Sequence, residues 1–111
     1  MRKLKSEFIK DEQKTKIMED FILNTLGYKN YKGYKFIGVY YYKNYEILFD
    51  HIPENKSISK HIRIKEMSNK KIKQEDLELI ANHFVGDNYF IQYGLFDNNT
   101  ALIWEEKATI N

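Results

Sequence analysis

Hydrophobic positions follow two different spacings along the chain, and the first of these predicts a helix over residues 12–26. Apolar side chains recur there at intervals of three and four residues, as on one face of an α-helix. They are Ile17, Met18, Phe21, Ile22 and Leu26. Gly27 comes directly afterwards and is a typical helix-ending residue. We therefore expect one apolar face of this helix to pack against the rest of the domain.

The segment before this helix has two interpretations. Leu4, Phe8 and Ile9 either extend the apolar face from an earlier start or belong to a separate arm. The residues between Ile9 and Ile17 are all polar, so their spacing does not decide between the two. Whether residues 1–11 belong to the first helix stays open.

Three consecutive strands are expected after the helix. Residues 36–42 and 45–49 are rich in aromatic and β-branched side chains, and Lys43 and Asn44 between them fit a two-residue hairpin turn. The alternation of Ile58, Ile62 and Ile64 then predicts a third, half-buried strand. The end of the chain predicts a second hairpin, with strands at 89–96 and 101–105.

A second helix is expected over residues 73–85, between these two groups of strands. Its apolar stripe is formed by Leu77, Ile80, Ala81 and Phe84. Glu75 and Asp76 suit the positive end of the helix dipole, and Gly86 suits its termination.

The element order α-β-β-β-α-β-β predicts a single α+β domain over residues 1–111. Strands that come in runs favour a mainly antiparallel sheet, here of about five strands with two helices. We expect both helices on one face of that sheet.

Composition narrows the function classes. The chain has no cysteine, which excludes disulfides, thiolate zinc sites and a cysteine nucleophile and fits a reducing, intracellular compartment. No apolar segment reaches the length of a signal peptide core or a membrane span, so we expect a cytoplasmic protein without membrane contact. The net charge of +2 combines a basic region, residues 1–75, with an acidic one, residues 76–111.

Candidate catalytic groups are few. The three histidines, His51, His61 and His83, are spaced like no common metal motif, and the glycines form no phosphate-binding loop. Asp50, His51 and His61 flank one loop between strands and could assemble a small hydrolase site. We assign no catalytic residue, metal or cofactor and expect a protein that is not an enzyme.

A tyrosine- and lysine-rich region is the main candidate for binding. Tyr40, Tyr41 and Tyr42 are consecutive on a strand, so at least one must point away from the core. Exposed tyrosine beside lysine suits either a protein interface or stacking on single-stranded nucleic acid. The candidate binding residues are Tyr31, Tyr34, Tyr41, Lys32, Lys35 and Lys43. Glu105 and Glu106, in the acidic C-terminal hairpin, form a second candidate that could imitate phosphate charge.

The stretch from His61 through Phe84, with the closing strand Ala101-Leu-Ile-Trp-Glu105, resembles small uncharacterised proteins encoded by phages and related mobile elements. Small size and richness in Lys, Tyr and Asn are also shared with anti-defence inhibitors, including anti-CRISPR proteins. The resemblance implies a non-catalytic protein that occludes a macromolecular partner, such as a nucleic-acid-processing host defence nuclease. The alternatives are direct nucleic-acid binding by the basic region, or the small hydrolase around Asp50, His51 and His61. The oligomeric state is not predicted.

Overall fold

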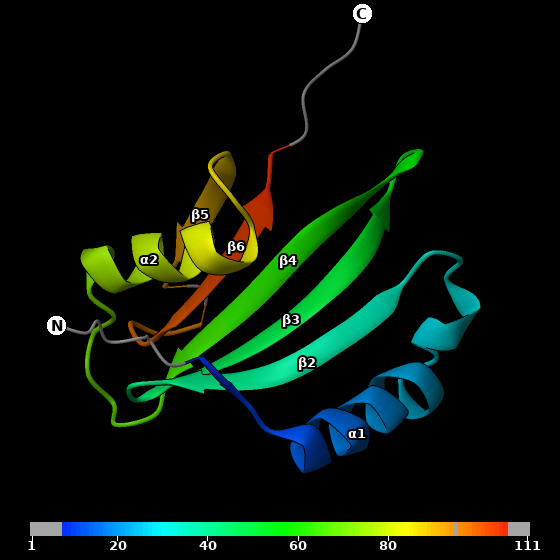
Figure 1. Cartoon of the computed structure of the whole chain (residues 1–111), viewed down its shortest axis with the longest axis horizontal. Helices are drawn as coiled ribbons and strands as arrows, with labels where there is room; N and C mark the ends of the chain where they lie inside the picture. The colour runs from blue at the N-terminus through cyan, green and yellow to red at the C-terminus, as the bar shows by residue number, and fades with distance from the viewer. Residues whose placement is uncertain (1–7, 95, 107–111) are drawn as a thin grey trace, which may run out of the picture.

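The computed structural model describes residues 8–94 and 96–106 and shows a six-stranded antiparallel sheet with two α-helices (Figure 1). The sheet order is β1-β2-β3-β4-β6-β5, and every pair of neighbours is antiparallel. The expected α+β fold is confirmed, with one strand more than predicted. That strand is the short β1, Ile9–Lys10, which pairs with the outer edge of β2. Ile9 and Lys10 therefore belong to a separate arm and not to the first helix.

The first helical segment matches its predicted range. Helix α1, Glu12–Asp20, begins where the Asp11 carboxylate accepts a hydrogen bond from the Lys14 backbone N–H at 2.9 Å. It continues into a π-helical turn, η1 (Phe21–Thr25), and Gly27 ends it with a left-handed φ of +79°. A 3-10 turn, η2 (Tyr28–Asn30), then leads toward the sheet.

The packed face of this segment differs from the expected stripe. Ile22 is buried and Met18 packs beside it, but Ile17 is 61% exposed and Phe21 44% exposed. The inner position of the first turns is occupied by Thr15, whose Oγ1 accepts a hydrogen bond from the Val39 backbone N–H of the sheet. With Thr15 held against the sheet by this bond, three members of the expected stripe, Ile17, Phe21 and Leu26, face outward, and only Ile22 and Met18 pack inward.

Three strands follow as predicted, but the second continues through Pro53 to Glu54, beyond its predicted end at Phe49. They are β2, Lys35–Tyr42, β3, Tyr45–Glu54, and β4, Ser57–Glu66. The turn between β2 and β3 contains Lys43 with a φ of +54°, as the expected tight hairpin requires. The closing hairpin consists of β5, Tyr89–Tyr93, and β6, Thr100–Glu105.

The second helix carries the main core. Helix α2, Gln74–Phe84, buries the four apolar residues predicted for its inner face and ends at Gly86, whose N–H bonds to the Ala81 carbonyl. This face packs on side chains of β3, β4 and β6 that are almost fully buried. They include Ile47, Ile62, Ile64, Ala101 and Ile103. The described part of the chain contains no helix long and apolar enough to cross a membrane.

The two helices lie on opposite faces of the sheet, which corrects the expectation of a single covered face. Val39 packs against Ile22 of the first helical segment, whereas the next residue, Tyr40, meets Phe84 of α2. Neighbouring strand residues point to opposite faces, so Tyr40 packs against α2 and Tyr41 packs on the side of α1. The two helices also cover different parts of the sheet, α1 beside β2 and α2 beside β5 and β6 (Figure 1).

Candidate functional site

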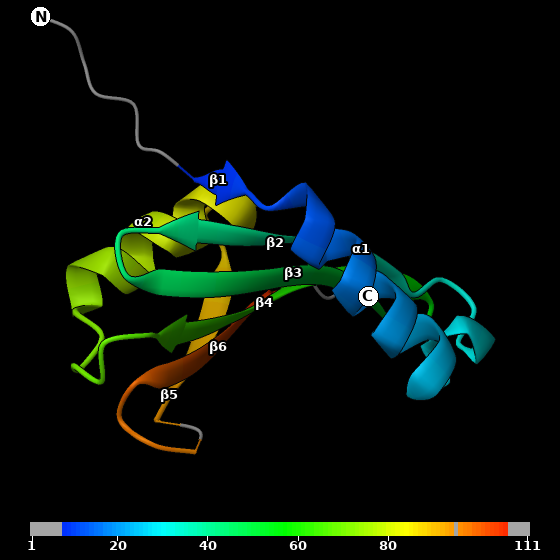
Figure 2. The same cartoon turned by 90° about the horizontal axis from the view of Figure 1, so that it is seen from below.

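Strands β4, β6 and β5 are covered by α2 on one face only. On the opposite face, α1 packs over β2 and the adjoining part of β3, and the sheet twists away from it toward β5 (Figure 2). We call the side chains of β4, β5 and β6 that point away from α2 the open face. They are His61, Arg63, Lys65, Phe90, Gln92, Leu102 and Trp104.

A row of three rings crosses the open face. Phe90, Trp104 and His61 occupy directly opposed positions on β5, β6 and β4. Neighbouring ring centroids are 5.6 Å apart between Phe90 and Trp104 and 6.4 Å apart between Trp104 and His61, with interplanar angles of 32° and 24°. Phe90 is 48% exposed, so the outer end of the row is open to a partner.

The inner end of this ring row meets a buried carboxylate. Asp50 of β3 is the cross-strand neighbour of His61 and accepts a hydrogen bond from the Tyr34 hydroxyl at 2.9 Å. Burial raises the pKa of Asp50, although the Tyr34 hydrogen bond and nearby cationic groups oppose this. Burial also lowers the pKa of His61, which favours a neutral imidazole at neutral pH.

This arrangement does not form the small hydrolase site considered from the sequence. Asp50 and His61 share a face, but His51 lies one residue further along β3 and points to the other side, opposite Lys60 and Lys35. The Asp50 carboxylate is bonded within the fold, and His61 Nε2 is buried with no hydrogen-bond partner among the described residues. No cluster of three or more potential metal ligands occurs within residues 8–94 and 96–106.

Positive charge lies next to the ring row. Arg63 and Lys65 follow His61 on the same face of β4 and are both exposed. In the described part of the chain neither forms an ion pair with a carboxylate. Both line a mostly apolar pocket of about 120 Å³ together with Leu48 and Phe96. Phe96, in the loop before β6, is 84% exposed and adds another ring beside these cations.

The predicted tyrosine- and lysine-rich site is only partly assembled. Tyr31 and Tyr34 line a pocket of about 300 Å³ with Tyr28, Ile52 and Pro53. Tyr28 makes edge-to-face contacts with both of the other tyrosines, at centroid distances of 5.4 and 5.0 Å. Lys32 is exposed in the same turn.

Three other members of that predicted site lie elsewhere. Tyr41 points under α1, where its hydroxyl and the Lys14 ammonium both bond to the Glu46 carboxylate. Lys35 is opposite His51 on the other face of the sheet. Lys43 forms an ion pair of 3.0 Å with Asp76 of α2, and this bond raises the pKa of Lys43.

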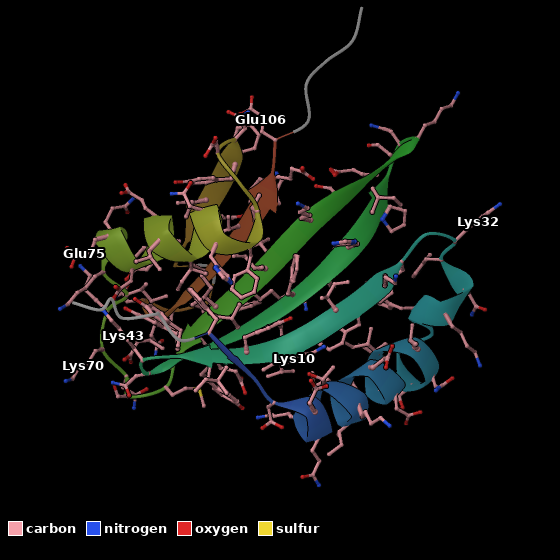
Figure 3. All side chains as sticks on the ribbon, viewed as in Figure 1. Lys10, Lys32, Lys43, Lys70, Glu75 and Glu106 are labelled. Atoms are coloured by element: carbon pink, nitrogen blue, oxygen red, sulfur yellow. The ribbon has the colours of Figure 1, made fainter. Side chains whose placement is uncertain are left out.

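The acidic pair at the end of β6 is separate again. Glu105 lies beside β4 and accepts a hydrogen bond from the Lys60 backbone N–H at 3.3 Å, whereas Glu106 is exposed. Figure 3 shows Lys32, Lys43 and Glu106 at three well-separated corners of the molecule. The candidate residues from the sequence therefore do not form one continuous surface.

Comparison of the chain with protein-family models, with curated proteins and with solved structures found no match.

The open face itself was missed by the sequence analysis. Phe90, Trp104 and Arg63 were read as ordinary strand positions, because alternation does not tell which face of a strand a helix will cover. One signal was available. Phe90 and Ile91 are adjacent apolar residues on one strand, as are Ile103 and Trp104, so each pair must place a large side chain on each face.

Proposed function

We propose that this protein is a non-catalytic binding module that covers a surface of a macromolecular partner with its open face. The observation that carries the proposal is the ring row of Phe90, Trp104 and His61, which both helices leave uncovered and of which Phe90 is the most exposed member. Arg63 flanks this row and forms no ion pair with a carboxylate among the described residues. Exposed aromatic rings beside arginine are the residue types that contribute most to binding energy at macromolecular interfaces.

The shape of the face also favours a large partner. The side chains of the ring row lie across three neighbouring strands, which are spaced by about 5 Å, and so form a broad surface. The adjoining pocket has a volume of only about 120 Å³, below the range of typical small-molecule sites. A flat aromatic surface of this kind gains affinity by burying area against another macromolecule.

The inhibitor function implied by the resemblance to phage-encoded proteins stays a prediction within this proposal. An occluding protein needs an exposed, rigid surface and no chemistry of its own. The open face offers such a surface, because its strands are anchored on the other side by the α2 core. In this account the acidic pair Glu105 and Glu106 lies outside the binding surface.

The proposal is tested by capture from lysate with matched variants. The tagged chain, Phe90→Ala and Phe21→Ala are each used as bait, with and without nuclease treatment, after circular dichroism has shown that all three fold. Phe21 is a suitable control because it is an exposed phenylalanine on the outer side of the first helical segment. We expect a defined macromolecule to be retained by the chain and by Phe21→Ala, and to be lost with Phe90→Ala.

Two results would overturn the proposal. One is retention that depends on Phe21 and not on Phe90, which would move the interface to the helix. The other is an identical set of retained molecules for all three baits, because the open face would then contribute nothing to binding.

A further inference from the structure

We infer that the partner of the open face is single-stranded nucleic acid, whose bases stack on Phe90 and Trp104 while Arg63 and Lys65 contact its phosphates. This inference rests on the proposed function and names the class of partner.

A protein that binds single-stranded nucleic acid first needs flat aromatic rings on its surface. Proteins that bind single strands without strong sequence preference place aromatic side chains where successive bases can stack on them. Phe90 and Trp104 occupy adjacent strands, with ring planes inclined by only 32° and centroids 5.6 Å apart. Neighbouring bases of one strand can therefore reach neighbouring rings. His61 extends the row, and its lowered pKa keeps it a neutral, planar ring.

Positive charge that is free to contact phosphates is the second requirement. This requirement distinguishes a nucleic-acid partner from most protein partners. Three carboxylates of β3 point to this side of the sheet, Glu46, Asp50 and Glu54, and the first two are already engaged within the fold. Glu54 is exposed at the end of β3 and interacts electrostatically with His61, beyond the end of the ring row that is distant from Phe90. Asp50 is buried and bonded to Tyr34. Glu46 is bonded to Lys14 at 2.7 Å and to Tyr41 at 2.9 Å.

The cations, in contrast, remain available. Arg63 and Lys65 are exposed beside the rings, and among the described residues neither has a carboxylate within ion-pair distance. A guanidinium group can bond a phosphate through two N–H donors or stack on a base. The open face thus combines stacking surfaces with positive charge, as a polyanion with exposed bases requires.

Duplex nucleic acid fits this face less well. In a duplex the bases are stacked on one another and cannot splay onto side chains, and its charge is read mainly by larger arrays of basic residues. The open face has two cations and a row of rings. We therefore expect preference for single strands over duplex.

Trp104 provides the test, because it is the only tryptophan in the chain and lies within the ring row. The full chain is titrated with oligothymidylate of about twelve nucleotides, a length within the site size of small single-strand binders, and its tryptophan fluorescence is followed. We expect saturable quenching, with much weaker quenching by a duplex of equal length. Phe90→Ala should weaken binding by about 5- to 100-fold, the usual loss for one stacked base.

Salt dependence tests the cationic half of the inference. Arg63→Gln should reduce the slope of log affinity against log salt concentration by about 0.7, the value for one phosphate contact on a single strand. Lys32→Gln removes the same charge from the exposed tyrosine turn and should leave the slope unchanged. Binding of Trp104→Phe, followed by fluorescence anisotropy of a labelled oligonucleotide, should persist because a stacking ring remains.

The outcomes separate this inference from the proposed function. Absence of quenching, or equal affinity of Phe90→Ala and the unchanged chain, overturns the nucleic-acid partner. If a nuclease-resistant protein is nevertheless captured in a Phe90-dependent way, the open face binds a protein and only this inference fails. The inference is also overturned if the salt slope falls with Lys32→Gln and not with Arg63→Gln. The phosphate contact would then lie in the turn that contains Lys32.

Discussion

Phe90 and Trp104 stand directly opposite each other on β5 and β6, on the face of the sheet that points away from α2. Their strand neighbours Ile91 and Ile103 are also opposed, but they point into the α2 core. The same two strands therefore supply the core on one side and, on the other, the exposed ring of Phe90 and the half-buried ring of Trp104. Substitutions on the core side of β5 and β6 should therefore affect stability, whereas substitutions on the open face should affect binding.

Truncation on the core side should cost stability. Ile103 is fully buried, so Ile103→Ala is expected to lower the free energy of unfolding by about 2–5 kcal/mol through lost burial and a cavity. Leu79 is a similar side chain that is exposed on the outer side of α2. Leu79→Ala should therefore change the free energy of unfolding by less than about 1 kcal/mol. Urea denaturation measures both. Equal losses would contradict the assigned core.

Thr15 should contribute more to stability than its position among polar residues in the sequence indicates. Its hydroxyl accepts the buried Val39 N–H at 2.9 Å, so Thr15→Val keeps the shape but leaves that donor unsatisfied. The expected loss is about 1–3 kcal/mol in the free energy of unfolding. Thr15→Ser, which keeps the hydroxyl, should retain most of the stability. A Thr15→Val variant as stable as Thr15→Ser would show that the hydrogen bond contributes nothing.

A buried hydrogen bond between Tyr45 and Asp76 should anchor α2 to β3. The Tyr45 hydroxyl donates to a carboxylate oxygen of Asp76, and both residues are at least 95% buried. Tyr45→Phe removes the donor and should cost about 1–3 kcal/mol, measured by thermal or urea unfolding. Tyr93→Phe removes a comparable hydroxyl, bonded to the Asn98 carbonyl at an exposed position, and is the control. The account requires the first loss to exceed the second.

Stability should fall as pH decreases from about 7.5 to 5.5, around the usual histidine pKa of about 6.5. Burial lowers the pKa of His51, His61 and His83, so each histidine binds protons more readily in the unfolded chain than in the folded one. The stability that this difference contributes is present above the unfolded pKa and is lost as pH falls toward the folded pKa. Urea midpoints at several pH values measure the slope, and His61→Asn should reduce it.

Asp50 should make stability depend on pH in the opposite direction, because its raised pKa favours proton binding by the folded state. Its effect belongs to a lower pH range, above the usual carboxyl value of 3.8. A free energy of unfolding that rises between pH 7.5 and 5.5 would contradict the lowered pKa values of the histidines.

Much of the fold was predictable because local patterns agreed with it. Residues 73–85 combine a regular apolar stripe with acidic residues at the start and Gly86 at the end, and α2 buries that whole stripe. The strands were likewise marked by aromatic and β-branched runs. Strand β1 was not predicted, since a two-residue strand carries no alternation to detect.

Features decided by long-range packing could not be predicted in this way. Ile17 and Ile22 both belong to apolar spacings of the first helix, and contacts with the sheet decide which one is buried. These contacts are the bond from Val39 to Thr15 and the packing of Ile22 on Phe36 and Val39. The same limit applies to the candidate site. The sequence marks Trp104 only as a strand residue, and it belongs to the open face because α1 and α2 cover different parts of the sheet.

The most direct measurement for the open face is site-specific photo-crosslinking in cells. A photoreactive phenylalanine analogue replaces Phe90 in one variant and Phe21 in another, both at exposed phenylalanine positions. The account predicts a discrete crosslinked adduct from position 90, sensitive to nuclease if the partner is nucleic acid, and none from position 21. An adduct from position 21 alone, or none from either position, would contradict the open face as the binding surface.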